Sequence, residues 1–150
     1  MTANVDPIFS RVPLVTVGQG IVGPNANTAM DGSGANCGLV FQADTSNGSF
    51  IQKIMMKAVG APAATVARFF LCSVTSAITF GTTNTSSNTN LIAEVTLPQI
   101  VTQSNVAAQP PIDVPLNIGI PAGYQIFVAY GTSTGSAGTG YVSTPIAGAY

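Results

Sequence analysis

Residues 65–73 read TVARFFLCS, and residues 91–97 read LIAEVTL. Both runs are short, rich in β-branched or aromatic residues and bounded by turn-forming residues, which is the pattern of β-strands. Residues 81–90 between them, GTTNTSSNTN, contain no apolar side chain to bury, so we expect a surface loop that joins two neighbouring strands. The two runs predict the central strand pair of an all-β domain.

Side chains alternate between the two faces of a strand, so each run has one apolar face. The predicted apolar faces are Ala67, Phe69 and Leu71 in the first run and Leu91, Ala93, Val95 and Leu97 in the second. Pairing these faces puts Arg68 and Glu94 together on the other side of the sheet. Only 6% of the residues are charged, so we interpret Arg68 and Glu94 as a structural ion pair.

Further strands are expected at residues 38–43, 49–59, 112–118, 124–130 and 141–146, with a short strand or loop edge at 77–80. In the run 49–59, strict alternation places Phe50 and Ile54 on one face and Ile51 on the other. Pro115 cannot donate to a strand ladder and marks an edge strand or a bulge. Short strands in this number, with no helical period, predict a two-sheet β-sandwich of the jelly-roll type over residues 37–150.

Residues 1–36 are interpreted as an extended N-terminal arm, because Pro7, Pro13 and Pro24 stand there among several glycines. Only residues 11–17 have the composition of a strand, and Pro13 would place that strand at a sheet edge. The apolar residues of the arm have no core of their own, so we expect them to lie on a neighbouring subunit in an assembly; a frayed terminus is the alternative. The candidate contact residues are Ile8, Phe9, Val12, Leu14 and Val15.

Charge is scarce along the whole chain, since four basic and five acidic residues give a formal net charge of −1. Typical globular chains carry about 25% charged residues. A surface so poor in charge is a weak barrier to association, so we expect an oligomer or part of a larger assembly rather than a monomer. No basic stripe supports nucleic-acid binding, and no run approaches the roughly 18 apolar residues of a membrane helix.

The N-terminus indicates the compartment, and the compartment bears on the state of the two cysteines. The first residues, MTANVDP, lack the charged and apolar regions of a secretory signal, so we expect synthesis in a cytoplasm. A cytoplasm disfavours a disulfide between Cys37 and Cys72. Cys72 follows Phe70 by two residues in a predicted strand, where a small buried thiol is expected.

The residues that ordinary catalysis needs are missing from this chain. It has no histidine, and its only glutamate is Glu94, which has Arg68 as a partner. General acid–base catalysis normally needs histidine or paired carboxylates, so we expect a protein that is not an enzyme. The aspartates stand beside proline, glycine or turn residues, where this side chain usually bonds the local backbone; they are Asp6, Asp31, Asp44 and Asp113.

No cofactor and no metal ion is expected. Two cysteines without a histidine do not complete a tetrahedral zinc site. Residues 18–23, GQGIVG, match the glycine spacing of a dinucleotide-binding motif. Pro24 and further turn residues follow in place of the helix that this motif requires, so we interpret the match as a coincidence.

Five short segments, taken in order, resemble one family of proteins. They are ANTAMDGSG (26–34), VFQA (40–43), NGS (47–49), ATVARFF (64–70) and IPAGY (120–124). Together they resemble the jelly-roll capsid decoration (cement) proteins of tailed bacteriophages, over roughly residues 26–130. The resemblance implies a homotrimer that binds the major capsid protein on the outside of a phage head and stabilises it. It implies no catalytic residue, and it implies a location on the virion after synthesis in the host cytoplasm.

Two other interpretations stay open. A tail-fibre, baseplate or head-fibre protein of a phage would share the fold and the composition. A carbohydrate-binding module is the third possibility, because exposed tyrosines stack on sugars; the candidates are Tyr130, Tyr141 and Tyr150, for which core packing is the alternative role.

Overall fold

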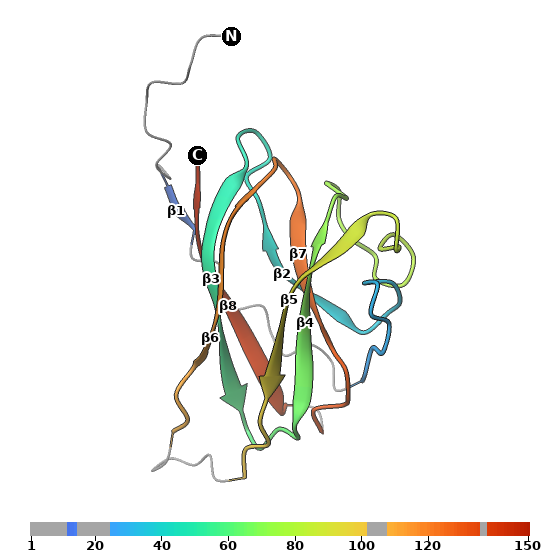
Figure 1. The fold of residues 1–150 in the computed structure, drawn as a ribbon, viewed down its shortest axis with the longest axis vertical. Helices are drawn as coiled ribbons and strands as arrows, with labels where there is room; N and C mark the ends of the chain where they lie inside the picture. Colours follow the sequence, from blue (N-terminus) through green and yellow to red (C-terminus); the bar gives the residue numbers. More distant parts are fainter. Residues whose placement is uncertain (1–11, 15–24, 102–107, 136–137) are drawn as a thin grey trace.

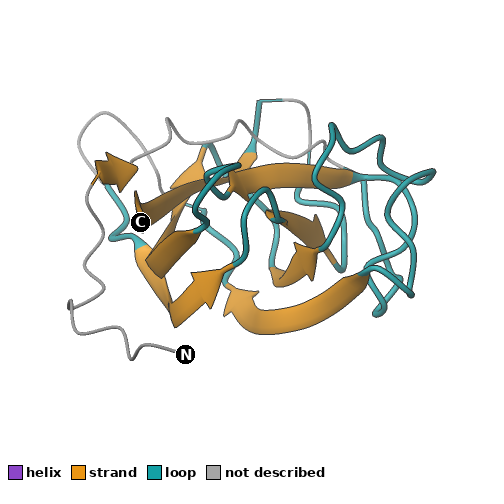
Figure 2. Cartoon of the chain, turned by 90° about the horizontal axis from the view of Figure 1, so that it is seen from above, coloured by secondary structure: helices purple, strands orange, loops and turns teal. Residues whose placement is uncertain are grey.

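The computed structural model describes residues 12–14, 25–101, 108–135 and 138–150, and this part of the chain forms eight strands in two antiparallel sheets (Figure 1). The strands are β1 (Val12–Leu14), β2 (Cys37–Gln42), β3 (Ser49–Val59), β4 (Thr65–Cys72), β5 (Thr89–Leu97), β6 (Ile112–Ile120), β7 (Gln125–Tyr130) and β8 (Gly140–Ala149). Sheet A has the order β1-β8-β3-β6, and sheet B has the order β2-β7-β4-β5. The two sheets pack face to face (Figure 2), so the prediction of an all-β sandwich is confirmed.

The strand pairing is nested. β1 pairs with β8, β2 with β7, β3 with β6 and β4 with β5, all antiparallel. This nesting results when one long hairpin is rolled up. The β3–β8 and β4–β7 pairs then join the hairpin pairs into two four-stranded sheets. This is the jelly-roll arrangement of eight strands.

The core lies between the two sheets, and β7 shows how the second sheet is buried on both faces. All six residues of β7 are buried. Ile126, Val128 and Tyr130 belong to the core between the sheets. Phe127 and Ala129 belong to a second apolar cluster on the face of sheet B that is turned away from sheet A, here called the outer face. A strand covered on both sides has no polar face, which explains the continuous apolar run 126–130.

A bulge corrects the predicted apolar face of residues 91–97. Phe69 pairs with Ala93 and Phe70 with Leu91, so β5 has one extra residue, Ile92, at this point. An extra residue reverses the alternation beyond it. Leu91 therefore leaves the core side and is 45% exposed, while Ile92 packs against the core.

A second register shift corrects the faces of residues 49–59. The pairing of β3 with β8 shifts between Ile51 and Lys53. Both Ile51 and Ile54 are consequently fully buried in the core, although strict alternation placed them on opposite faces.

Other sequence-based expectations need smaller corrections. β5 is an edge strand of sheet B and not part of its centre. β8 continues through Ala149, beyond the expected strand end at residue 146, and Ala147, Gly148 and Ala149 each pair with both β3 and β1. Residues 77–80 form no strand. Pro115 is exposed in the edge strand β6, as expected from its missing N–H.

The loop between β4 and β5 is not the purely solvent-exposed connection that its polar composition predicts. Its apolar residues cover the outer face of sheet B, over Phe70, Cys72, Phe127 and Ala129; they are Val74, Ile78 and Phe80. The ring of Phe127 stacks on that of Phe70 and meets that of Phe80 edge-on, with both centroid distances at 5.3 Å. Asn84, in the middle of the polar run, is only 2% exposed.

Buried amide side chains hold this outer cover in place. Asn84 Nδ2 donates to the carbonyls of Gly32 (2.7 Å) and Gly34 (2.9 Å), and its Oδ1 accepts from the Gly81 N–H (2.7 Å). Gln125 Nε2 donates to the carbonyls of Val74 and Ser76. These bonds hold the β4–β5 loop against the segment 25–36 and against β7. In a chain with few charges, amide side chains make connections that ion pairs could make elsewhere.

Residues 25–36, assigned to the arm from sequence, lie against the sandwich. The Asn27 N–H donates to the Tyr130 carbonyl at 2.8 Å. Asn27 Nδ2 donates to the carbonyls of Ser33 and Ala35, and its Oδ1 accepts from the Ala29 N–H. Thr89 Oγ1 donates to the Asp31 carbonyl. A truncation meant to remove only an arm should therefore stop at residue 24.

Candidate assembly surfaces

The strand β1 lies at the outer edge of sheet A. Val12 pairs with Ala149, Pro13 with Gly148 and Leu14 with Ala147. Leu14 packs against the core, whereas Val12 is 54% exposed. The edge position suits Pro13, which has no N–H to give to a further strand.

Of the five candidate contact residues in the arm, the structure describes Val12 and Leu14. Ile8, Phe9 and Val15 lie outside the described residues, as does the glycine motif at 18–23. The contact of β1 is with the β8 of its own chain, so a contact of these residues with another subunit stays a prediction.

The small size of β1 matters for what it can do. A strand of three residues adds few ladder hydrogen bonds and buries one side chain, Leu14, on the core. Elements with so few contacts belong to the low-stability end of a structure and open locally at little cost. β1 is therefore suited to exchange its contact with β8 for a contact with a partner.

Arg68 and Glu94 stand opposite each other in the β4–β5 ladder and form an ion pair. Arg68 Nε lies 2.8 Å from Glu94 Oε1. The Arg68 side chain is 10% exposed and that of Glu94 is 46% exposed. Both project from the outer face of sheet B, beyond the part that the β4–β5 loop covers.

Three large apolar side chains are exposed that sequence reasoning did not select. They are Met30, Leu91 and Val101. Met30 and Leu91 flank the hydrogen bond between Thr89 and the Asp31 carbonyl, so they belong to the same end of β5. Leu91 is exposed because of the bulge in β5, which no signal in the sequence reveals.

The two cysteines are free thiols. Cys72 is fully buried beside Phe70, as expected. Burial raises the pKa of Cys37 to about 11, an effect only partly offset by the N–H that Asn27 donates to its Sγ. At neutral pH Cys37 is therefore a protonated, poorly nucleophilic thiol.

Two of the tyrosines considered for sugar stacking are in the core. Tyr130 and Tyr141 are buried, and the Tyr130 hydroxyl donates to the Tyr141 carbonyl at 2.9 Å. Burial raises the pKa of Tyr130 far above its usual value. Stacking of Tyr130 or Tyr141 on a sugar is thus excluded by their packing, and Tyr150 is half-buried.

A shallow depression of about 250 Å³ lies on sheet A, between the ends of β3, β6 and β8. Its polar side chains are the amides of Gln52 and Asn117, and its aromatic wall is Phe50. An aromatic ring beside two amides is a pattern that suits a sugar, although the depression is open and small.

The titratable side chains of the described residues are few and scattered. Within them no group of three or more histidine, cysteine, aspartate or glutamate side chains is close enough to hold a metal ion. Besides Arg68 and Glu94, the ion pair found there joins Lys53 Nζ to Asp113 Oδ2 at 2.7 Å. In the same part of the chain no helix is long and apolar enough to cross a membrane.

Comparison of the chain with protein-family models, with curated proteins and with solved structures finds no match. The candidate surfaces among the described residues are the edge strand β1, the exposed apolar side chains, the face around Arg68 and the depression beside Phe50.

Proposed function

We propose that this chain is a non-enzymatic virion protein that binds the outside of a phage head as a homotrimer and stabilises it. The observation that carries the proposal is β1, a minimal edge strand that leaves Val12 exposed beside a jelly-roll sandwich. The near absence of charge and the ordered resemblance of residues 26–130 to capsid decoration proteins support it.

The physical role follows from linkage. A protein that binds the assembled capsid, and not its separate subunits, stabilises the assembled state by the free energy of binding. A trimer carries three identical contacts with the capsid. Once one contact has formed, the other two meet the capsid at a high effective concentration, so weak individual contacts are enough for tight binding. Such a protein needs surfaces and no catalytic group.

The fold is compatible with this role but does not decide it. Jelly rolls occur in viral capsid proteins and also in lectin domains. A function read from fold alone is an analogy, so the proposal rests on the exposed edge strand and the composition.

The oligomeric state gives a first prediction. Light scattering on a sizing column is expected to give three times the 15.2 kDa of one chain, because a chain with 6% charged residues has little charge repulsion to keep monomers apart and the resemblance implies a trimer. A mass of a single chain over the whole concentration range would contradict the homotrimer.

Removal of the arm gives a second prediction. Deleting residues 1–24 is expected to lower the affinity for heads that lack the protein by at least about tenfold, since it removes β1 and the remaining candidate contact residues. Co-sedimentation of the purified chain with such heads measures the affinity. The sandwich is expected to stay folded, because residues 25–36 and their bonds to β7 and Thr89 remain.

A matched control separates binding from folding. Val12→Ser changes an exposed side chain of β1 and leaves Leu14 on the core. It is expected to weaken head binding without changing the denaturation midpoint. Wild-type affinity of the 1–24 deletion would show that the arm makes no capsid contact.

The alternatives remain as proposals with separate tests. A tail-fibre, baseplate or head-fibre protein would be present in few copies per virion. A carbohydrate-binding module is favoured by one observation, the depression lined by Phe50, Gln52 and Asn117. Glycan-array binding that is lost in Phe50→Ala would support the module over the decoration protein.

A further inference from the structure

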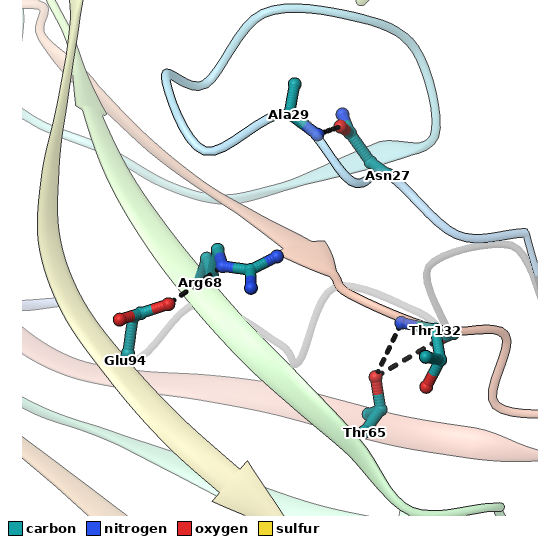
Figure 3. A network of polar contacts seen from close by, with 6 residues as sticks. All are labelled: Asn27, Ala29, Thr65, Arg68, Glu94 and Thr132. Carbon is teal, nitrogen blue, oxygen red and sulfur yellow. Dashed lines mark hydrogen bonds and ion pairs between the residues drawn. The ribbon is translucent and has the colours of Figure 1, made fainter.

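The outer face of sheet B has two halves. The β4–β5 loop covers the half that contains Phe70 and Phe127. The other half, which the described residues of the β4–β5 loop do not cover, contains Arg68, which extends its guanidinium away from Glu94 in Figure 3. The Arg68 side chain is nine-tenths buried and lines a depression, so the partners of its remaining donors need to be accounted for.

Arg68 uses one of its donors within the chain. Its Nε donates to Glu94 Oε1 at 2.8 Å. Among the described residues, the hydrogen bond found for the guanidinium is that of Nε, and none is found for Nη1 or Nη2. In the same part of the chain, the one fully buried side-chain N or O atom without a partner is Thr134 Oγ1, so these two nitrogens reach solvent.

The nitrogens open into a shallow depression of about 370 Å³. Its lining comes from the start of β4, from β5 and from the end of β7: Ala64, Thr65, Val66, Thr96, Gly131 and Thr132. A side chain at position 131 would place its Cβ 3.2 Å from Nη1, so Gly131 leaves the guanidinium accessible.

The threonine hydroxyls around the guanidinium donate elsewhere. Thr65 Oγ1 donates to the Thr132 carbonyl and accepts from the Thr132 N–H (Figure 3). Thr132 Oγ1 donates to the Ala64 carbonyl. The hydroxyls of Thr65 and Thr132 are thus engaged in their own hydrogen bonds, and the charged donors of the site are those of the guanidinium.

We propose that this depression binds the carboxylate of an aspartate or glutamate side chain on a partner protein. Two N–H donors in a planar fork match the two oxygens of a carboxylate, and such charge-assisted bonds are stronger than neutral ones. The methyl groups of Ala64, Val66 and Thr96 line the space for the methylene groups of that side chain.

The shape of the site favours a protein as its ligand over a free metabolite. The depression is too open to enclose a small molecule, whose sites usually bury most of the ligand. A protein surface laid over the face would exclude the remaining water and strengthen the ion pair. With a net charge of −1 and one arginine at the site, a polyphosphate chain has no further cations to bind.

The site does not depend on the capsid assignment, and it can be tested on the purified chain. The probe is the α-amide of N-acetylglutamate, titrated at constant ionic strength, and its neutral counterpart is the α-amide of N-acetylglutamine. The readouts are the NMR signals of the Arg68 Nε–H and of the Gly131 and Thr132 backbone N–H groups. We expect saturable shifts with the glutamate probe alone, with a dissociation constant on the order of 10–100 mM for one isolated contact.

Three variants sharpen the test. Arg68→Lys keeps the charge but loses the fork, and is expected to weaken binding at least about fivefold. Glu94→Gln removes the competing carboxylate at an exposed position, and is expected to tighten binding about threefold or more. Lys53→Gln removes a cation from the other sheet and is expected to change nothing.

Two results would overturn the proposal. One is an equal response to the glutamate and glutamine probes. The other is unchanged affinity in Glu94→Gln, a variant that keeps the size of the side chain and therefore tests the site even if Arg68→Lys fails to fold.

Discussion

Replacing Phe127 with alanine is expected to lower the free energy of unfolding by about 3–5 kcal/mol. Phe127 is fully buried in the second cluster, between the rings of Phe70 and Phe80. Its loss leaves a cavity under the β4–β5 loop and removes two aromatic contacts, each of which adds to the area that the ring buries. Urea or guanidinium unfolding measures the change.

Phe80→Ala is the matched control for this prediction. Phe80 contacts the same ring from the loop side but is only half-buried, so its loss is expected to cost clearly less than that of Phe127. A cost below about 1.5 kcal/mol for Phe127→Ala would mean that the second cluster is not a rigid part of the fold.

Replacing Asn84 with alanine is expected to cost about 2–4 kcal/mol. The substitution deletes the bonds to the Gly32 and Gly34 carbonyls and the acceptor for the Gly81 N–H. The Gly32 carbonyl belongs to a buried residue, where an unsatisfied polar group costs more than the net worth of its bond, whereas Gly34 and Gly81 are exposed residues whose freed groups can bond to water. Hydrogen exchange is expected to show faster exchange at Gly81 and across residues 25–36.

Asn90→Ala provides the comparison, because Asn90 is the same residue type at an exposed position of β5. We expect it to change stability by less than about 0.5 kcal/mol. Equal small effects of the two substitutions would contradict the role of Asn84 as the link between the loop and the segment 25–36.

The strands of this protein were predictable from its sequence, because the signal is local. Alternation and turn residues located β2, β3, β4, β5, β6 and β7 to within about two residues at each end. The order of strands within the sheets was not predictable. The nested pairing depends on contacts between segments far apart in the chain, and an apolar face carries no information about which apolar face it meets.

The bulges were the main source of error within the strands. One extra residue in β5 exposes Leu91, and one register shift in β3 buries Ile51. Nothing in the composition of either run marks these positions. Strict alternation therefore misplaces residues on the far side of each irregularity.

The covering of the outer face of sheet B by the β4–β5 loop was not predicted, for a different reason. A run such as residues 81–90 has the composition of solvent-exposed loop, yet Asn84 is buried because its amide satisfies three backbone groups at once. Whether an asparagine meets such partners is decided by tertiary placement. The pair of Arg68 and Glu94 was accessible to sequence reasoning because so few charges are present.

Counting copies of the chain in purified virions tests the central claim most directly. Quantitative mass spectrometry against the major capsid protein gives the ratio. A trimer at every position where three capsid subunits meet predicts about one chain per capsid subunit, by symmetry. A ratio far below this, with the few copies of a fibre or baseplate component, or the absence of the chain from virions, would contradict the decoration role.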